Sequence, residues 1–289
     1  SRAFPDDSGG PRLSVLSALG DRNKNRIALS AAASYQYSEQ VQLSFLLGSN
    51  RSEELSSSPA VAPGIRDGVP ASNIDSEFQR ENMAVYSFVK WSEKTQSSVG
   101  IDYLYEDGEL AGDIELFPGF SLPQDFALDR TTTGIFSEVL YQPTERLAAN
   151  LSLRVDKADG FKEQVTGRLG LDYRSGAVTF SLSGGEAFKL PSFYALGHAL
   201  VGNGDLKPET SRNFELGLQW QAEGRQLSVI AFRSDYDNLI NFDPTIFSLI
   251  NESDVRSKGL EFAAGFEPTA SSSVAVNATY VDVSVQGGG

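Results

Sequence analysis

The feature that most constrains this chain is a two-residue alternation between apolar side chains and polar or small ones. Successive side chains of a β-strand point to opposite faces, so each such segment predicts a strand with one apolar face. None of the apolar sets contains a charged residue, and we predict about thirteen strands in all. The clearest segments are 27–35, 41–47, 147–155, 165–173, 214–220, 260–266 and 274–280.

The connections between these segments fall into two groups. Six are short and polar, and the others are mostly longer, at about 49–78, 106–129, 157–162, 185–210 and 237–254. An aromatic residue stands at the end of the strand before each short turn, and such rings prefer a membrane interface. This asymmetry is typical of an all-β, antiparallel transmembrane β-barrel. The six aromatic residues are Tyr37, Trp91, Tyr141, Tyr173, Trp220 and Phe266.

A soluble all-β module, such as a sandwich or a propeller, is the alternative fold, with its apolar faces packed against each other. The uneven spacing of the short turns argues against a propeller. No transmembrane helix is predicted, because no uninterrupted apolar run reaches ~18 residues. The net charge of -14 argues against nucleic-acid binding, since phosphates repel an acidic surface.

The sequence offers no catalytic motif. It contains no P-loop, no dinucleotide-binding fingerprint and no G-x-S-x-G nucleophile motif. It has no cysteine and one histidine, so cysteine chemistry and multi-histidine metal sites are excluded within this chain. We therefore predict that the protein is not an enzyme and holds no cofactor tightly.

The segment 106–129 is strongly acidic, with seven carboxylates and no Lys or Arg. As an outer loop it would repel an anionic ferric siderophore unless other parts compensated, and it would suit a neutral or cationic ligand. Four of the carboxylates are closely spaced and could hold Ca²⁺, although the spacing is not that of an EF-hand. A solvated loop is the alternative. The candidate calcium ligands are Asp107, Glu109, Asp113 and Glu115.

Residues 180–262 carry an ordered set of motifs. A strand leads into FKLPS, a loop follows, and GNGDLKPE then opens a strand that contains E-x-G. The set resembles the late barrel of TonB-dependent outer-membrane receptors. In the last third of the chain the motifs themselves are similar, and in the first two thirds the resemblance lies more in the spacing of strands and turns. Prolines and glycines shape rigid loops, so we expect a mainly structural role. The motif residues are Phe188, Lys189, Pro191, Ser192, Gly202, Asn203, Leu206, Pro208, Glu209, Glu215 and Gly217.

The resemblance implies a larger architecture, in which a plug domain fills a 22-stranded barrel and the partner TonB pulls on an N-terminal box. Residues 1–289 show neither plug nor box, and residues 1–20 lack a signal peptide. We therefore expect one partial barrel domain, with its true N-terminus upstream.

The expected function is active import of a scarce nutrient across the bacterial outer membrane, with the barrel in contact with lipid. The nutrient would be a small metal complex, such as a ferric siderophore or cobalamin. A passive porin or an adhesin barrel is the alternative, and it should lack the motif set.

His198 lies between the two halves of the motif set. Haem receptors of the family carry an axial ligand in this region, so His198 is a candidate haem ligand. The flanking segments read FKLPS and GNGDL, however, where haem receptors usually have FRAP and NPNL. An ordinary polar loop side chain is the alternative.

Overall fold

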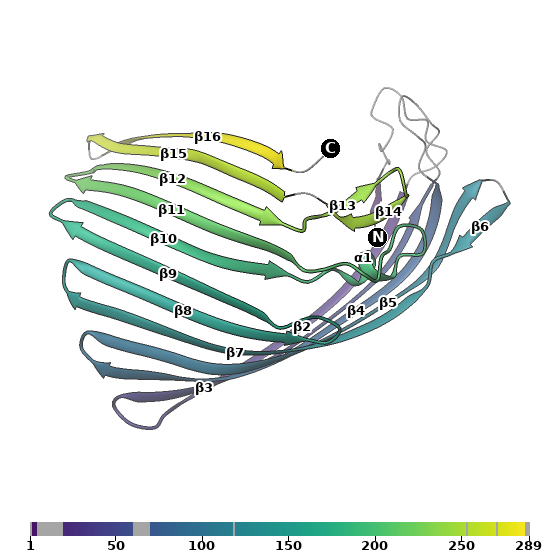
Figure 1. The fold of residues 1–289 in the computed structure, drawn as a ribbon, viewed down its shortest axis with the longest axis horizontal. Coiled ribbons are helices and arrows are strands. Elements are labelled where there is room, and N and C mark those ends of the chain that lie inside the picture. Colours follow the sequence, from purple (N-terminus) through teal and green to yellow (C-terminus); the bar gives the residue numbers. More distant parts are fainter. Residues whose placement is uncertain are drawn as a thin grey trace.

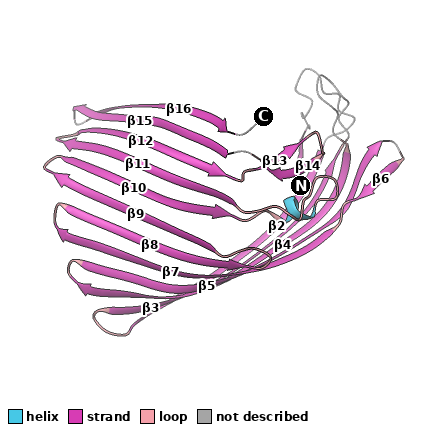
Figure 2. Cartoon of the chain, in the orientation of Figure 1, coloured by secondary structure: helices cyan, strands magenta, loops and turns pink. Residues whose placement is uncertain are grey.

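The computed structural model describes residues 2–4, 20–59, 70–117, 119–252, 254–269 and 271–286. These residues form antiparallel strands almost throughout, with one short helix, α1 (Phe193–Gly197) (Figures 1 and 2). None of the helices in the described part is long and apolar enough to cross a membrane. The strands are β1 (Arg2–Phe4), β2 (Gly20–Gln36), β3 (Val41–Ser58), β4 (Ala71–Ser92), β5 (Thr95–Phe117), β6 (Phe120–Pro123), β7 (Phe126–Thr144), β8 (Leu147–Ala158), β9 (Gln164–Ser175), β10 (Val178–Lys189), β11 (Glu209–Ala222), β12 (Arg225–Asp237), β13 (Ile240–Asp243), β14 (Ser248–Asn251), β15 (Asp254–Thr269) and β16 (Ser272–Gln286).

The strands make one curved meander, in which chain neighbours pair along the order β1-β2-β3-β4-β5-β7-β8-β9-β10-β11-β12-β15-β16. This path holds thirteen strands, β6 pairs with β5 beside it, and β13 and β14 form a separate hairpin. The predicted strand number and antiparallel order are therefore confirmed for the described residues. Figure 1 shows the sheet curving like part of a barrel wall.

The six predicted short turns are all present, and they lie together at one end of the sheet (Figure 1). Local backbone geometry explains some of them. Glu223 and Gly224 both have positive φ, of 41° and 70°, as a tight hairpin turn requires. Between Lys90 and Ser92 the pairing of β4 with β5 shifts by one residue, at a β-bulge close to the turn.

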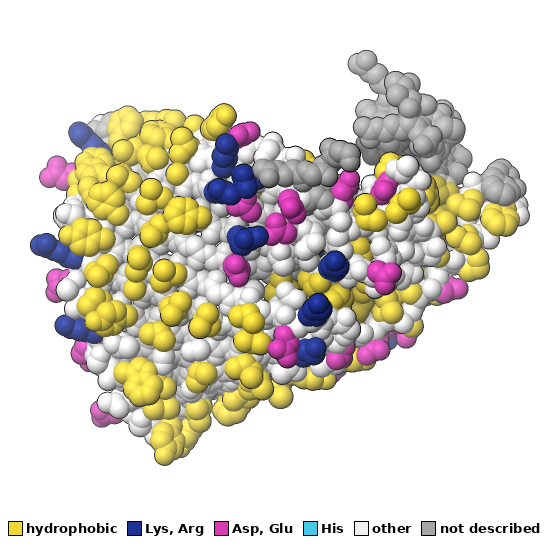
Figure 3. All heavy atoms as spheres, in the orientation of Figure 1, with side chains coloured by type: hydrophobic (Ala, Val, Ile, Leu, Met, Phe, Trp, Pro, Cys, Tyr) yellow, Lys and Arg dark blue, Asp and Glu magenta, His cyan; other side chains and the backbone are white. Residues whose placement is uncertain are grey.

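The predicted apolar sets share one face of the sheet. Cross-strand pairing places Leu151 opposite both Val139 and Leu169, and it joins Leu218 to Val229 in the same way. These faces are not stacked against each other: Leu151 is 46% exposed and Leu169 is also 46% exposed. Figure 3 shows hydrophobic side chains spread over the turn side of the visible face, between charged ones along the turn edge and a band of charged ones across the middle. The sandwich alternative is therefore wrong.

The aromatic residues at the short turns lie on the same outward face. Tyr37 is 71% exposed and Trp91 is 66% exposed, and Tyr141, Tyr173 and Phe266 are exposed as well. Such a row of rings at the edge of an apolar band is what a membrane interface favours.

Two of the predicted long loops are mostly strand. β3 continues to Ser58 and β4 begins at Ala71, while β5 runs to Phe117, so the sheet extends well past the apolar band. The alternation persists there in inverted form, because Leu110 and Ile114 on the inner face are buried and the acidic residues Asp107, Glu109, Asp113 and Glu115 alternate with the inner face and point outward. Because the outward side chains are acidic, this alternation was not recognised in the sequence as that of a strand. The connections at 157–162 and 237–254 match the predicted loops closely, and 237–254 contains the β13–β14 hairpin. The loop predicted at 185–210 begins later, at residue 190, because β10 continues to Lys189.

Candidate functional site

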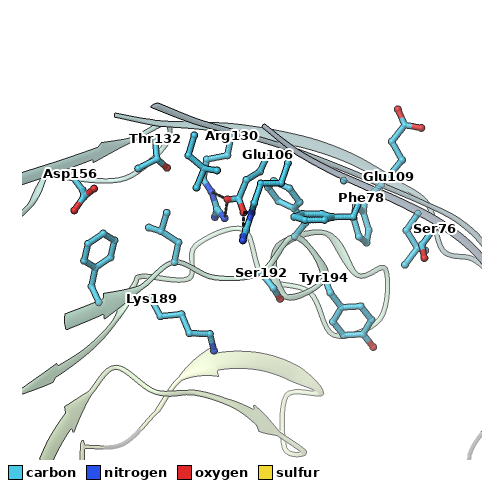
Figure 4. Close-up of a pocket in the computed structure, with 18 of the residues that line it drawn as sticks. Ser76, Phe78, Glu106, Glu109, Arg130, Thr132, Asp156, Lys189, Ser192 and Tyr194 are labelled. Atoms are coloured by element: carbon cyan, nitrogen blue, oxygen red, sulfur yellow. Dashed lines mark hydrogen bonds and ion pairs between the residues drawn. The ribbon is translucent and has the colours of Figure 1, made fainter. Parts of the chain in front are cut away.

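A large cavity lies on the inner face of this extension and has a volume of about 790 Å³. Its wall comes from β4, β5 and β7, and its other side from the end of β10 and from α1 (Figure 4). Aromatic and aliphatic side chains dominate the lining, with charged groups at separate points. The lining includes Phe78, Leu104, Leu110, Phe126, Phe188, Phe193 and Tyr194, with Arg80, Glu106, Arg130, Arg154, Asp156 and Lys189.

The segment 190–208 folds inward and packs against the wall. Pro191 is followed by Ser192, whose hydroxyl accepts a hydrogen bond from Ala195 N at 3.1 Å and caps α1. Phe193 is buried against β5, where Gly108 leaves the room: a Cβ at position 108 would lie 2.5 Å from the Phe193 ring. A glycine in the middle of a strand thus marks the docking point of this segment.

A charge cluster joins the segment to the wall. Glu106 is 4% exposed and lies between two guanidinium groups. Arg130 donates to its Oε2 through Nε at 3.2 Å and Nη2 at 2.6 Å, and Arg80 donates to its Oε1 through Nε at 3.1 Å and also through Nη2. Arg130 Nη1 also donates to the Pro191 carbonyl oxygen at 3.0 Å. Two cations against one carboxylate leave this cluster with one net positive charge.

A second cluster at another part of the wall has the opposite balance. Arg154 donates to Asp102 Oδ1 at 2.9 Å and to Asp156 Oδ2 at 2.8 Å. Asp156 is 2% exposed. Gly134 leaves space for this guanidinium, because a Cβ there would overlap Arg154 Nη2. One cation between two carboxylates leaves one net negative charge, so the two clusters polarise the inner wall.

The first half of the predicted motif set meets at the cavity. Phe188, Lys189 and Ser192 line it, and Pro191 supplies the carbonyl that Arg130 binds. Lys189 Nζ forms an ion pair with Glu209 Oε2 at 3.0 Å across the start of β11. These residues therefore shape one side of the cavity.

The second half holds two loops together. Asn203 Nδ2 donates to the Leu249 carbonyl at 2.9 Å, and Glu209 Oε1 accepts from Ile240 N at 2.9 Å, so the segment 190–208 is bonded to the β13–β14 region. Leu206 is buried at 3% exposure. Other members fill tight positions: Gly202 lies against the His198 backbone, Pro208 precedes β11, Gly217 faces Ser181, and Ser183 Oγ donates to Glu215 at 3.4 Å.

Sequence reasoning missed Asn251, which completes this connection. Its Oδ1 accepts from Lys207 N at 2.7 Å, and its Nδ2 donates to the Lys207 carbonyl at 3.0 Å and to the Asn238 carbonyl at 2.8 Å. Asn238 has a positive φ of 58°, a conformation that Asn tolerates better than most residues. No local motif marks Asn251.

The four candidate calcium ligands do not converge. Asp107, Glu109, Asp113 and Glu115 lie on one face of an extended strand, so the first and last are about 26 Å apart. Calcium needs oxygen ligands within about 2.6 Å. Glu109 points away from the cavity in Figure 4, and in the described ranges no group of three or more His, Asp or Glu could hold a metal ion. These four carboxylates therefore lie along a strand and not in the loop that was predicted at 106–129.

His198 follows α1 and is buried at 8% exposure. Its Nδ1 accepts hydrogen bonds from Leu200 N at 3.1 Å and Val201 N at 3.3 Å, and its ring lies tilted against the Tyr194 ring, with the two centroids 4.5 Å apart. Burial lowers the pKa of His198, and it raises the pKa of Tyr194. The geometry gives His198 a part in the local fold and lends haem ligation no support.

Comparisons with known sequences agree with this architecture. A family model described as "TonB dependent receptor-like, beta-barrel" matches residues 3–289. The vitamin B12 transporter BtuB of Vibrio vulnificus is 32% identical over 126 residues, 42% of this chain and 21% of that protein. BtuB of Photobacterium profundum is 27% identical over 190 residues, 61% of this chain and 31% of that protein. The chain thus spans between 21% and 31% of the length of these relatives.

Solved structures show the same fold at low identity. The ferric yersiniabactin uptake receptor FyuA from Yersinia pestis has a TM-score of 0.76 at 13% identity, covering 98% of this chain and 47% of that one. The copper transporter OprC has a TM-score of 0.61 at 13% identity, covering 99% of this chain and 56% of that one. Since the family model matches nearly every residue, the chain belongs to the TonB-dependent receptor-like β-barrel family.

Proposed function

We propose that this protein of the bacterial outer membrane is an uptake receptor that binds a small metal complex in the cavity beside α1. A ferric siderophore or cobalamin would be the cargo, and TonB would energise its release and import. The relatives named above include vitamin B12 transporters, and the structural neighbours include a ferric yersiniabactin receptor.

The observation that carries the proposal is the cavity itself. Its volume of about 790 Å³ lies within the range of roughly 300–1,000 Å³ that small-molecule sites occupy. Apolar walls with a few charged groups suit a compact ligand that needs orientation as well as burial. The inward segment 190–208 closes one side, so a ligand there would touch both the barrel wall and a loop.

Growth and uptake measurements test the proposal. The full-length gene, expressed in a host that lacks its own receptors, should support growth on limiting cobalamin or on a ferric siderophore only when TonB is present. Phe193→Ala should reduce uptake, because Phe193 forms part of the cavity wall. Phe180→Ala is the matched control, since Phe180 is 45% exposed on the outward face.

Uptake that persists without TonB would instead support passive diffusion. Uptake of none of these complexes would refute the proposed cargo.

A further inference from the structure

We propose that Arg80 recognises an anionic oxygen group, a carboxylate or a phosphate, on a ligand with a flat apolar body. This inference rests on the proposed function, because it names the chemistry that the same cavity would select. The Glu106 cluster has one net positive charge, and Arg80 is its exposed cation.

The two arginines of the cluster are used differently. Arg130 is buried, and its three nitrogens bind Glu106 and the Pro191 carbonyl. Its guanidinium also lies over the Phe193 ring, with 5.0 Å between the guanidinium carbon and the ring centroid. Arg130 is thus fully engaged in holding the inward segment to the wall.

Arg80 has donors left over. Its Nε and Nη2 both donate to one oxygen of Glu106, and the described residues give its Nη1 no partner. A guanidinium has five N–H donors in a planar fork that matches a carboxylate or a phosphate. The side chain is 50% exposed, whereas that of Arg130 is 10% exposed. Of the two arginines of the cluster, Arg80 is therefore the one that can offer donors to a ligand in the cavity.

The charge balance favours an anion at this position. Glu106 already neutralises one guanidinium, and Arg130 takes the bonds to Oε2, so the excess positive charge falls on the exposed Arg80. The Arg154 cluster has an excess of carboxylate, which would repel the same anionic group. The two clusters together would orient a ligand with its anion toward β4.

Aromatic rings beside Arg80 define the rest of the ligand. Its guanidinium carbon lies 5.6 Å from the Phe78 ring centroid, and the Phe78 and Phe193 centroids are 6.3 Å apart. Tyr194 lines the cavity on the side of the inward segment (Figure 4). Flat apolar groups pack favourably against such rings.

Equilibrium dialysis with simple probes tests the inference on the full-length protein in detergent. The probes are 1-naphthoate and 1-naphthyl phosphate, with neutral 1-naphthamide as the uncharged analogue. Arg80→Gln should weaken binding of both anions by roughly ten- to a hundredfold, the range expected for charge-assisted hydrogen bonds. It should change naphthamide binding less than about twofold, since apolar contacts remain. Arg80→Lys should restore part of the affinity for the anions.

Arg51→Gln is the matched control. This substitution makes the same change in net charge, and Arg51 is similarly exposed, at 53%. Arg51 lies on the outward face, however, opposite Gln79 on the neighbouring strand. It should leave all three affinities unchanged. Equal weakening by Arg51→Gln, equal loss of naphthamide, or no loss of either anion in Arg80→Gln would overturn the inference. Failure of the TonB-dependent growth test with Arg80-dependent anion binding intact would refute the transport proposal alone.

Discussion

Substitution of Gly108 by Ala should release the inward segment from the barrel wall. An added Cβ would lie 2.5 Å from Phe193 Cδ2, whereas ordinary contact begins at 3.4 Å, so the ring must retreat by 0.9 Å (3.4 − 2.5) or more. Phe78 and Arg130, from the strands on either side of β5, contact the same ring, so a retreat of Phe193 would loosen those contacts as well. Overpacking of this kind costs about 1–3 kcal/mol.

Amide hydrogen exchange measures this cost directly. In the full-length protein, amides of residues 192–207 should exchange about 5- to 150-fold faster, which is that cost expressed as an opening equilibrium. Amides of β5 itself should exchange no faster, because Ala suits a strand at least as well as Gly. The effect should therefore be confined to the inward segment.

Gly204→Ala supplies the control within the same segment. A Cβ at position 204 meets nothing within 4 Å, so exchange should stay at the wild-type rate. Wild-type exchange in Gly108→Ala, or equal acceleration in Gly204→Ala, would show that the Gly108–Phe193 contact does not hold the segment in place.

Three further predictions follow from the charge, the histidine and the apolar band. Glu106→Gln should destabilise the docked segment by about 3 kcal/mol in the same exchange assay, because it leaves Arg130 buried without its carboxylate. Glu77→Gln removes one member of an exposed ion pair and should cost under ~1 kcal/mol. Because burial lowers the pKa of His198, the undocked segment binds a proton more tightly than the docked one. Docking should therefore be fully stable above pH 6.5 and weaken as the pH falls below it. Amide exchange measured across pH should show this dependence in the wild type and not in His198→Asn. Leu151→Arg should cost about 2–4 kcal/mol in urea unfolding from lipid vesicles, while Ser152→Arg on the inner face should cost much less, and equal costs would argue against a lipid-facing Leu151.

The strands, the turns and the outward face could be predicted from the sequence because each depends on local order along the chain. The cavity could not, because Arg80, Glu106 and Arg130 come from three strands and meet only through cross-strand register. The register itself depends on the bulge beside Ser92. Counting back from the Ser92–Thr95 pair without that bulge would place Arg80 opposite Asp107, on the wrong face.

The acidic extension shows the same limit in another form. Apolar residues alternate in both parts of β5, but they face outward near Ile101 and inward at Leu110 and Ile114. A strand that leaves the membrane exchanges lipid for water on its outer side, so its polarity pattern reverses. Asp107 and Glu109 therefore read as loop residues although they belong to a regular strand. Residue composition alone cannot show that reversal.

The length of β4 has a consequence for where the proposed ligand would bind. Its 22 residues are about twice the roughly 9–11 that a strand needs to cross a bilayer. Arg80 lies in the surplus part, on a hydrogen-bonded wall rather than on a pliable connection. The spacing between Arg80 and its neighbours should therefore be the same in thick and thin bilayers, and water-soluble reagents added to intact cells should be able to reach it.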